Sequence, residues 1–329
     1  MRIVATAPGR AGIVGNPTDG YGGSVISCSL AARARVVIED ADEFRVQVGE
    51  LATVFRAKRD YLLKNDRFDV VRAVMQFFGR TDLKVSVTVT TDVPVQGGLS
   101  GSTAILASLV AAFMKMWGRE TSRYHLAETL RIIELNYLKI HCGYQDHYMT
   151  TFGGINFMDF REKENYRRLA DEIYATVEPL TPHVSQLPFL LAHSGIRHVS
   201  GAVHLPIRER WLEGEKIVVE GYERISAIAR RGKRALIERD WETLADLMNE
   251  NHRIQHEISH VGERNLRMMN AAIENGALAA KLAGAGGGGT IIILTHDPER
   301  QKPALTEAGA ARFLTLSPSD GVRIEEAAL

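Results

Sequence analysis

The sequence VPVQGGLSGSTA, from Val93 to Ala104, decides the fold, because it places a glycine-rich loop between a predicted strand and a predicted helix. Before it, residues 83–91 (LKVSVTVTT) alternate apolar and polar side chains and are rich in Val and Thr, which indicates a strand. After it, residues 104–116 (AILASLVAAFMKM) are apolar and rich in Ala and Leu, which indicates a buried helix.

The composition of this loop is compatible with phosphate binding. Glycines let the backbone approach an anion and adopt positive φ at little cost, and the first turn of a helix offers unpaired N–H groups and the positive end of a dipole. A glycine-rich turn with an ordinary Ser/Thr cap has the same composition, so the stretch alone leaves both interpretations open. It is not a Walker A loop, because no Gly-Lys-Ser/Thr follows the glycines. The candidate phosphate-binding residues are Pro94, Gly97, Gly98, Leu99, Ser100, Gly101, Ser102 and Thr103.

Length and charge exclude several classes of function. The chain has 329 residues, of which 45% are hydrophobic, enough for two domains with sizeable cores. Lys plus Arg and Asp plus Glu balance at 40 each, so no basic field is available for a nucleic acid partner. The sequence has no run of 18 apolar residues, and its first residues, MRIVATAPGR, lack the long apolar region expected of a signal peptide. Cys28 and Cys142 form no CxxC motif. We expect a soluble, cytoplasmic monomer or homodimer whose partners are small molecules rather than nucleic acids or membranes.

The order of predicted elements indicates an α+β fold, because strands and helices are mixed without a regular βαβ alternation. Prolines at 179, 182 and 188 favour a domain boundary there, giving domains 1–185 and 186–329. The expected strands are 2–6, 24–38, 187–193 and 290–294, with a hairpin at 44–54; the expected helices are 69–78, 122–140, 207–232, 240–259 and 264–275.

Phosphoryl transfer needs a phosphate cradle, Mg²⁺ held by oxygen ligands and a group that handles the acceptor hydroxyl. Ser102 is a candidate Mg²⁺ ligand, and Glu134 lies in the middle of a predicted helix between apolar neighbours. Asp146, in a glycine-bearing loop, is a candidate base, and Arg10, after Pro8-Gly9, could orient it or neutralise a phosphoryl charge. Each of these residues, considered alone, also has an ordinary structural explanation. Glu134 could be a solvated helix carboxylate, Asp146 a turn residue and Arg10 a surface arginine.

Taken together, three motifs resemble those of the GHMP small-molecule kinases. They are APGRAGIVGNPTDGYGG (7–23), PVQGGLSGSTA (94–104) and KLAGAGGGG (281–289), in this order and across almost the whole chain. The resemblance implies an ATP- and Mg²⁺-dependent kinase of two α+β domains. The first would be similar to the second domain of ribosomal protein S5, and the second would be ferredoxin-like.

The resemblance also implies roles for individual residues. The Mg²⁺ pair falls on Ser102 and Glu134, the catalytic aspartate on Asp146, and its arginine neighbour on Arg10. The third motif adds Gly286 and Gly287 to the nucleotide-binding residues. Asp19 would hold sugar hydroxyls, and the acceptor-binding candidates are Asn16, Asp19, Gly22, Gly23, Tyr144 and Arg197.

The particular residues at the motif positions resemble those of the glucuronokinase branch, whose members phosphorylate the anomeric hydroxyl of D-glucuronate to give glucuronate 1-phosphate. The shared features are Gly-Asn-Pro, Gly-Leu-Ser-Gly-Ser, Gln-Asp followed by Phe-Gly-Gly and Met-Asp-Phe, and the run RERWLEG at 208–214. Asn16-Pro17 replaces the Glu-His pair of galactokinases, and Gly101 stands where the family often has serine. An anionic sugar would want cationic partners, for which Arg197, His198, Arg208 and Arg210 are candidates, although 208 and 210 also suit a solvated helix face.

Three alternatives stay open. Heptose-phosphate 1-kinases share the Gln-Asp and Phe-Gly-Gly features, whereas mevalonate-type kinases carry a lysine where this chain has Arg10. A non-catalytic sugar or nucleotide sensor of the same fold is disfavoured by the complete catalytic set. His252, His256 and His260 recur at i, i+4 and i+8 and could ligate a metal, but a plain polar helix face or a core contact is the favoured interpretation.

Overall fold

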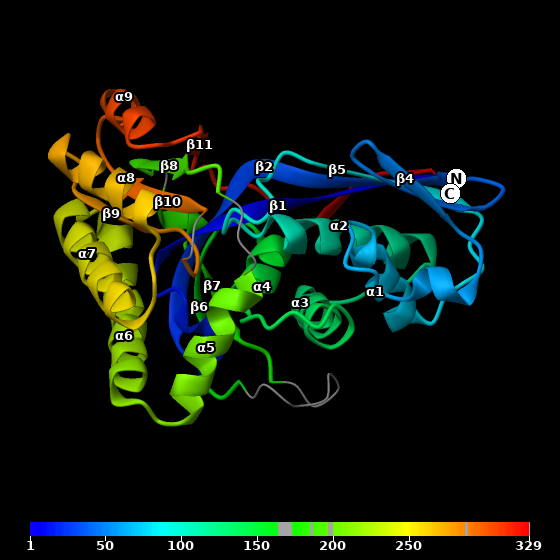
Figure 1. Ribbon diagram of the computed structural model, residues 1–329, viewed down its shortest axis with the longest axis horizontal. Coiled ribbons are helices and arrows are strands. Elements are labelled where there is room, and N and C mark those ends of the chain that lie inside the picture. The colour runs from blue at the N-terminus through cyan, green and yellow to red at the C-terminus, as the bar shows by residue number, and fades with distance from the viewer. Residues whose placement is uncertain (164–172, 185–186, 197–199, 287–288, 329) are drawn as a thin grey trace.

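A computed structural model of the chain describes residues 1–163, 173–184, 187–196, 200–286 and 289–328 (Figure 1). It contains two β-sheets with helices packed against them, which confirms the predicted α+β class.

The larger sheet has eight strands and includes both ends of the chain. Its main path runs β12-β1-β2-β5-β3-β4, and β6 extends it by pairing with β2 and β7. All described pairs are antiparallel except β3 with β5. The strands are β1 (Arg2–Val14), β2 (Ser24–Asp40), β3 (Phe44–Val48), β4 (Leu51–Phe55), β5 (Val85–Thr91), β6 (Ile155–Asp159), β7 (Thr176–Pro179) and β12 (Arg323–Ala328).

Helices cover one face of this sheet (Figure 1). They are α1 (Asp69–Phe78), α2 (Gly101–Met116), α3 (Arg123–Ile132), a π-helical turn (Ile133–Tyr137) and α4 (Gln145–Phe152). Short 3₁₀ turns occur at Thr18–Tyr21, Lys58–Tyr61 and Thr181–His183. The apolar α2 packs its buried side chains against the valines and isoleucines of β1, β2 and β5, as its composition predicts.

The smaller sheet has the strand order β11-β8-β10-β9, and all its pairs are antiparallel. This order is that of a ferredoxin-like fold, as the motifs imply. Its strands are β8 (Phe189–His193), β9 (Ala279–Leu282), β10 (Thr290–Leu294) and β11 (Arg312–Thr315). The helices of this part are α5 (Ser200–Leu212), α6 (Lys216–Glu238), α7 (Trp241–Ile258), α8 (Glu263–Glu274) and α9 (Pro298–Glu307).

Three predicted elements differ from the structure by more than a few residues at an end or by a break. The first strand was expected to stop at Thr6, but β1 continues to Val14, because register shifts after Pro8 and Gly12 let it keep pairing with β2. The helix expected over 207–232 is two helices, separated by a turn in which Gly214 has φ +74°. The helix expected over 122–140 begins after Ser122, whose side chain caps it, but passes into the π turn at Ile133.

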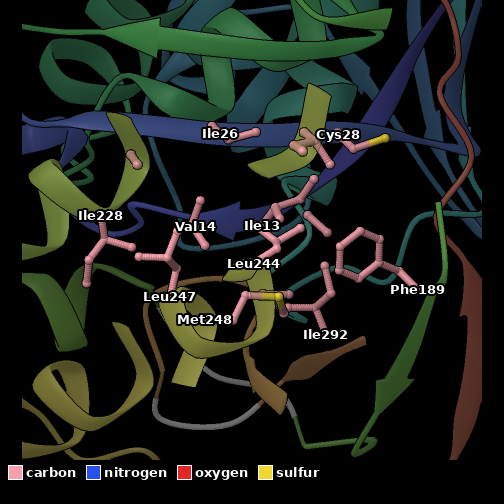
Figure 2. Close-up of a cluster of buried hydrophobic side chains, with 14 of the residues drawn as sticks. Ile13, Val14, Ile26, Cys28, Phe189, Ile228, Leu244, Leu247, Met248 and Ile292 are labelled. Carbon is pink, nitrogen blue, oxygen red and sulfur yellow. The ribbon is translucent and has the colours of Figure 1, made fainter. Parts of the chain in front are cut away.

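One apolar core joins the two sheets. Figure 2 shows Ile13 and Val14 of β1 and Ile26 of β2 facing Leu244 and neighbouring residues of α7, together with side chains from α6, β8 and β10. Each fully buried side chain of this size contributes about 1.5–3 kcal/mol. The second half of β1 is therefore held between the two parts of the molecule. The boundary between 185 and 186 stays a prediction, and β12, at the end of the chain, returns to the first sheet.

Candidate active site

Arg10 lies at the centre of the candidate site, on the part of β1 held between the two sheets. Its side chain is 7% exposed. Its Nε donates to Oδ1 of Asp146 at 2.8 Å, and its Nη2 donates to the same oxygen. Its Nη1 donates to the carbonyl oxygens of Gly98 at 2.7 Å and Ala283 at 3.2 Å, one in each glycine-rich loop. One guanidinium thus connects both loops to the first turn of α4.

The loop between β5 and α2 turns sharply before the helix begins. Gly98 and Ser100 have φ of +74° and +60°, so Ser100 adopts a left-handed conformation that is costly for a residue with a side chain. A Cβ on Gly101 would lie 2.9 Å from the carbonyl oxygen of Pro94, which explains glycine there. The Ser100 hydroxyl is buried and has no hydrogen-bond partner. An unpaired buried hydroxyl at a helix N-terminus fits a site for a phosphate oxygen.

The loop after β9 packs directly on the first loop. A Cβ on Gly284 would lie 2.9 Å from the carbonyl oxygen of Gly98, so the two backbones are in contact. The hydroxyl of Thr290 also donates to the carbonyl oxygen of Gly97 at 2.8 Å. Gly286 has φ +114°, and Gly287 lies outside the described residues. The two glycine-rich loops therefore form one wall of the site.

Asp146 presents its carboxylate to this wall, with 34% of its side chain exposed. Burial raises its pKa, but the Arg10 guanidinium outweighs burial, with smaller contributions from His147 and Ser100, so the pKa lies below the usual value. Ser100 contributes by proximity, since its hydroxyl makes no hydrogen bond of ordinary geometry. Asp146 is therefore ionised at neutral pH, as a base must be.

Asp19 sits at the N-terminus of α4, the helix that carries Asp146. Its Oδ2 accepts hydrogen bonds from the backbone N–H groups of Tyr144 at 2.7 Å and Gln145 at 2.9 Å. A carboxylate here satisfies two free donors and faces the positive end of the helix dipole. Gly22 ends the short helix that presents Asp19, and a Cβ on Gly23 would lie 2.1 Å from the hydroxyl oxygen of Thr18, so both glycines shape this turn.

Glu134 extends from the π turn toward α2 and α4. Its Oε2 accepts a hydrogen bond from Thr103 at 3.2 Å and lies 2.8 Å from Nε2 of His147. Burial lowers the pKa of His147, but Cys142 and Glu134 raise it to about 10. Among the described residues no donor reaches Oε1 of Glu134, and Ser102 is exposed. Two oxygens of the kind that Mg²⁺ prefers thus line the same cavity.

Two adjoining cavities open beside these residues. The smaller, of about 140 Å³, is lined by both glycine-rich loops and by Arg10, Asn16, Ser102, Glu134 and Asp146. The larger, of about 390 Å³, is lined by Asp19, Tyr21, Arg131, Lys139, His141 and Arg208. Asp19, Cys142 and Gly143 line both. The larger cavity has three cationic side chains against one carboxylate among its described residues, so it favours an anionic ligand.

The side chain of Asn16 makes hydrogen bonds to residues of the third motif. Its Nδ2 donates to the carbonyl oxygens of Leu282 and Gly284, and its Oδ1 accepts a hydrogen bond from Nζ of Lys281 at 2.7 Å. Lys281 is fully buried, and burial, with a smaller contribution from Arg10, lowers its pKa to about 7. Asn16 therefore holds the third motif in place, in addition to lining the smaller cavity.

The other predicted acceptor residues lie in different environments. Tyr144 is buried and lines neither cavity; its ring packs on Phe160, with the Arg131 guanidinium 3.8 Å from the ring centre. Arg197 and His198 lie outside the described residues. Arg208 lines the larger cavity, whereas Arg210 donates to both carboxylate oxygens of Glu215 and to a carbonyl of α7.

The histidine stripe does not form a cluster of potential metal ligands in the described part of the chain. His252 and His256 stack with ring centres 6.0 Å apart, and burial lowers the pKa of His252 to about 4. The described residues contain one group of three potential ligand side chains, and none of these histidines belongs to it. The interpretation as a polar face or a core contact stays a prediction.

Sequence analysis did not single out Arg131, Lys139, His147 or Lys281. His147 follows Asp146 directly, and Lys139 and His141 form a polar run after an apolar helix, which were the available signals. Nothing in their spacing indicates that Arg131 and Lys139 line one cavity. Nor does it indicate that His147 reaches Glu134 or that Lys281 reaches Asn16, because these contacts depend on the tertiary fold.

The chain matches two family models in succession. Residues 63–154 match the model described as "GHMP kinases N terminal domain", and residues 233–312 match "GHMP kinases C terminal".

No helix among the described residues combines the length and apolar character that crossing a bilayer requires.

Curated relatives match over nearly their whole lengths. Glucuronokinase 1 of Arabidopsis thaliana is 27% identical, covering 94% of this chain and 89% of its own. A mevalonate kinase of Pyrococcus furiosus is 23% identical (99% and 99%), and the D-glycero-alpha-D-manno-heptose 7-phosphate kinase of Campylobacter jejuni is 25% identical (92% and 91%). A solved D-glycero-D-manno-heptose 1-phosphate kinase from Bacteroides thetaiotaomicron shares the fold, with a TM-score of 0.74 at 19% identity over 99% of this chain and 100% of that one.

Removing the Asp19 carboxylate is expected to destabilise the protein. In Asp19→Ala the N–H groups of Tyr144 and Gln145 lose their acceptor, which should lower the free energy of unfolding by about 1–2 kcal/mol. Urea denaturation measures this, with Asp240→Ala, which removes the cap of α7, as a matched control. If only Asp240→Ala is destabilised, Asp19 does not support α4.

Lys281 is expected to make stability rise with pH between about 7 and 10.5. Its folded-state pKa is lowered to about 7 from 10.5, so the unfolded chain binds the extra proton throughout this window. The slope of unfolding free energy against pH should therefore be about 1.4 kcal/mol per pH unit smaller in Lys281→Met than in the unsubstituted protein. Denaturation at pH 7.5 and 9.5 tests this, and equal slopes in the two proteins would contradict it.

Proposed function

The chain belongs to the GHMP kinases, and from this premise we propose that it transfers the γ-phosphoryl group of ATP to the anomeric hydroxyl of a sugar acid, with D-glucuronate as the acceptor. Membership makes it a phosphotransferase that acts on an alcohol group. The observation that carries the finer proposal is the cationic cavity next to Asp146.

Asp146 is the proposed base. It is ionised, partly exposed and lines the smaller cavity, close to the residues shared with the larger one. An acceptor hydroxyl between the cavities would give its proton to the Asp146 carboxylate as it attacks phosphorus. The attack forms the new P–O bond while the bond to the leaving phosphate oxygen breaks, and ADP carries that electron pair away.

Arg10 has two proposed tasks. Its hydrogen bonds hold one oxygen of Asp146, which fixes the direction of the other. Its positive charge also lies beside the loop that would hold the phosphates, where it offsets negative charge in the transition state.

The nucleotide phosphates fit the loop between β5 and α2. The unpaired Ser100 hydroxyl and the first N–H groups of α2 are donors there, and Gly101 keeps this backbone free of side chains. Ser102 and Glu134 are the residues that would hold Mg²⁺. When bound, Mg²⁺ supplies neutralisation of triphosphate charge. His147 and Thr103 orient the Glu134 carboxylate.

The larger cavity is the proposed acceptor site. Arg131, Lys139 and Arg208 surround a space of about 390 Å³, large enough for a monosaccharide, and they would attract its carboxylate. Glucuronokinase 1 of Arabidopsis thaliana, 27% identical, supports this acceptor. The cytoplasmic location stays a prediction.

A heptose phosphate is the second candidate acceptor. The same cations would bind a phosphate, and a heptose 7-phosphate kinase is 25% identical to this chain. A coupled ADP-release assay over glucuronate, galacturonate, heptose 7-phosphate, galactose and mevalonate distinguishes these acceptors. If no acceptor releases ADP while a sugar raises the melting temperature, the protein is a sensor rather than a kinase.

Asp146→Asn should abolish most turnover and leave nucleotide binding intact. The amide keeps the shape of the side chain but cannot take a proton, and a positioned base contributes about 10²–10⁴-fold. ADP release measures turnover and calorimetry measures nucleotide affinity, with Asp246→Asn on the exposed face of α7 as control. Near-normal turnover in Asp146→Asn would remove this residue from the mechanism.

Arg208→Gln should raise KM for glucuronate about 10–100-fold, because a hydrogen bond to a charged group contributes about 1.5–3 kcal/mol. KM for ATP should change little. Arg210→Gln is the matched control, since Arg210 lies two residues away and is paired with Glu215. Equal increases in both variants would contradict an acceptor site at Arg208.

A further inference from the structure

Three side chains with metal-binding atoms converge beneath the candidate active site. Glu134 comes from the π turn, Cys142 from the loop that follows it, and His147 from α4. A carboxylate oxygen, the sulfur and a ring nitrogen all lie within 4.8 Å of one another. They are the one such group among the described residues.

The cluster has an unsatisfied buried atom. His147 is 0% exposed, and its Nε2 lies 2.8 Å from Oε2 of Glu134. Its Nδ1 is buried and has no hydrogen-bond partner. A fully buried imidazole with one unpaired nitrogen, next to a thiol and a carboxylate, needs an explanation beyond packing.

The mixture of ligand types distinguishes this cluster from a Mg²⁺ site. Sulfur and imidazole nitrogen are preferred by Zn²⁺, whereas Mg²⁺ takes oxygen ligands in octahedral geometry. We propose that Glu134, Cys142 and His147 form a three-residue Zn²⁺ site with an open fourth position. Coordination releases the proton of the Cys142 thiol and the proton on the coordinating nitrogen of the His147 imidazolium. The resulting thiolate and the carboxylate balance the charge of the ion.

An ion can reach this site through the cavities. Cys142 lines both of them and is partly exposed, and Glu134 lines the smaller one, while His147 closes the inner side. The fourth position therefore faces the cavity, where water or a phosphate oxygen can occupy it.

Binding of Zn²⁺ should inhibit phosphoryl transfer, an effect that rests on the proposed function. Glu134 is one of the two residues proposed to hold Mg²⁺. A carboxylate engaged by Zn²⁺ with Cys142 and His147 is turned away from that task. Zn²⁺ therefore inhibits phosphoryl transfer, and Cys142 determines the sensitivity.

Binding is tested on the whole metal-free protein by titration with Zn²⁺ against a chromogenic chelator. One tight equivalent is expected, and Cys142→Ala should weaken it at least about tenfold. The control is Cys28→Ala, because Cys28 is the other cysteine and is buried in the core on β2, away from the cluster. Absence of a tight equivalent, or unchanged binding in Cys142→Ala, would overturn the site.

Cobalt identifies the ligand without relying on affinity. Co²⁺ should give a thiolate-to-metal charge-transfer band in the unsubstituted protein and in Cys28→Ala, and Cys142→Ser should lack it. Melting curves establish that the Cys142 variants are folded. A band that persists in Cys142→Ser assigns the thiolate elsewhere and overturns the proposal.

Inhibition is measured separately, by ADP release at fixed Mg²⁺ and increasing Zn²⁺, each variant being compared with its own rate without zinc. The concentration for half inhibition should rise at least about tenfold in Cys142→Ala and stay unchanged in Cys28→Ala. Zinc binding without inhibition of an active enzyme would overturn the regulatory part. Zinc binding in a protein that turns over no acceptor would instead count against the proposed function and leave the metal site supported.

Discussion

The site depends on the buried guanidinium of Arg10. Its donors reach Asp146 and a carbonyl oxygen in each of the two glycine-rich loops. Breaking a buried ion pair by removing one partner costs about 3–5 kcal/mol, because the remaining charge has no counterion. The loops and α4 are therefore positioned relative to one another by a group that also sets the charge of the site.

The surrounding structure fixes both partners of this ion pair, Arg10 on β1 and Asp146 on α4. The core of Figure 2 holds the second half of β1 between the sheets, so Arg10 emerges from a rigid strand. Asp19 fixes the start of α4 by accepting hydrogen bonds from two of its backbone N–H groups. Precise placement matters because catalytic groups must stay within a fraction of an ångström of their working geometry. Fold stability and site geometry are thus linked through the same residues.

Electrostatics divides the site into regions of different charge. The carboxylates of Asp146 and Glu134 each face a cationic partner, Arg10 and His147. Lys281 has neutral partners instead, which is why burial dominates its pKa. The larger cavity keeps an excess of cations for an anionic ligand. The charged groups of the site therefore have different electrostatic environments, because the contacts around each group come from a different segment of the chain.

Much of this architecture could be predicted from local pattern. The alternation of 83–91 and the apolar run of 104–116 predicted a strand and a helix that the structure contains. The three motifs indicated the family and the set of Arg10, Ser102, Glu134 and Asp146, of which the structure brings all four to one cavity. Pattern did not predict the continuation of β1 past Pro8-Gly9, since that depends on pairing with β2.

The sequence by itself determined the element types, the glycine loops and the family, because these depend on neighbouring residues and on motif order. Only the tertiary structure decided that Asp19 supports α4, that Asn16 is tied to Lys281, and that Cys142 and His147 meet Glu134. These contacts join residues far apart along the chain or across irregular turns. Their geometry follows from how the two sheets and the π turn pack, which no local spacing encodes.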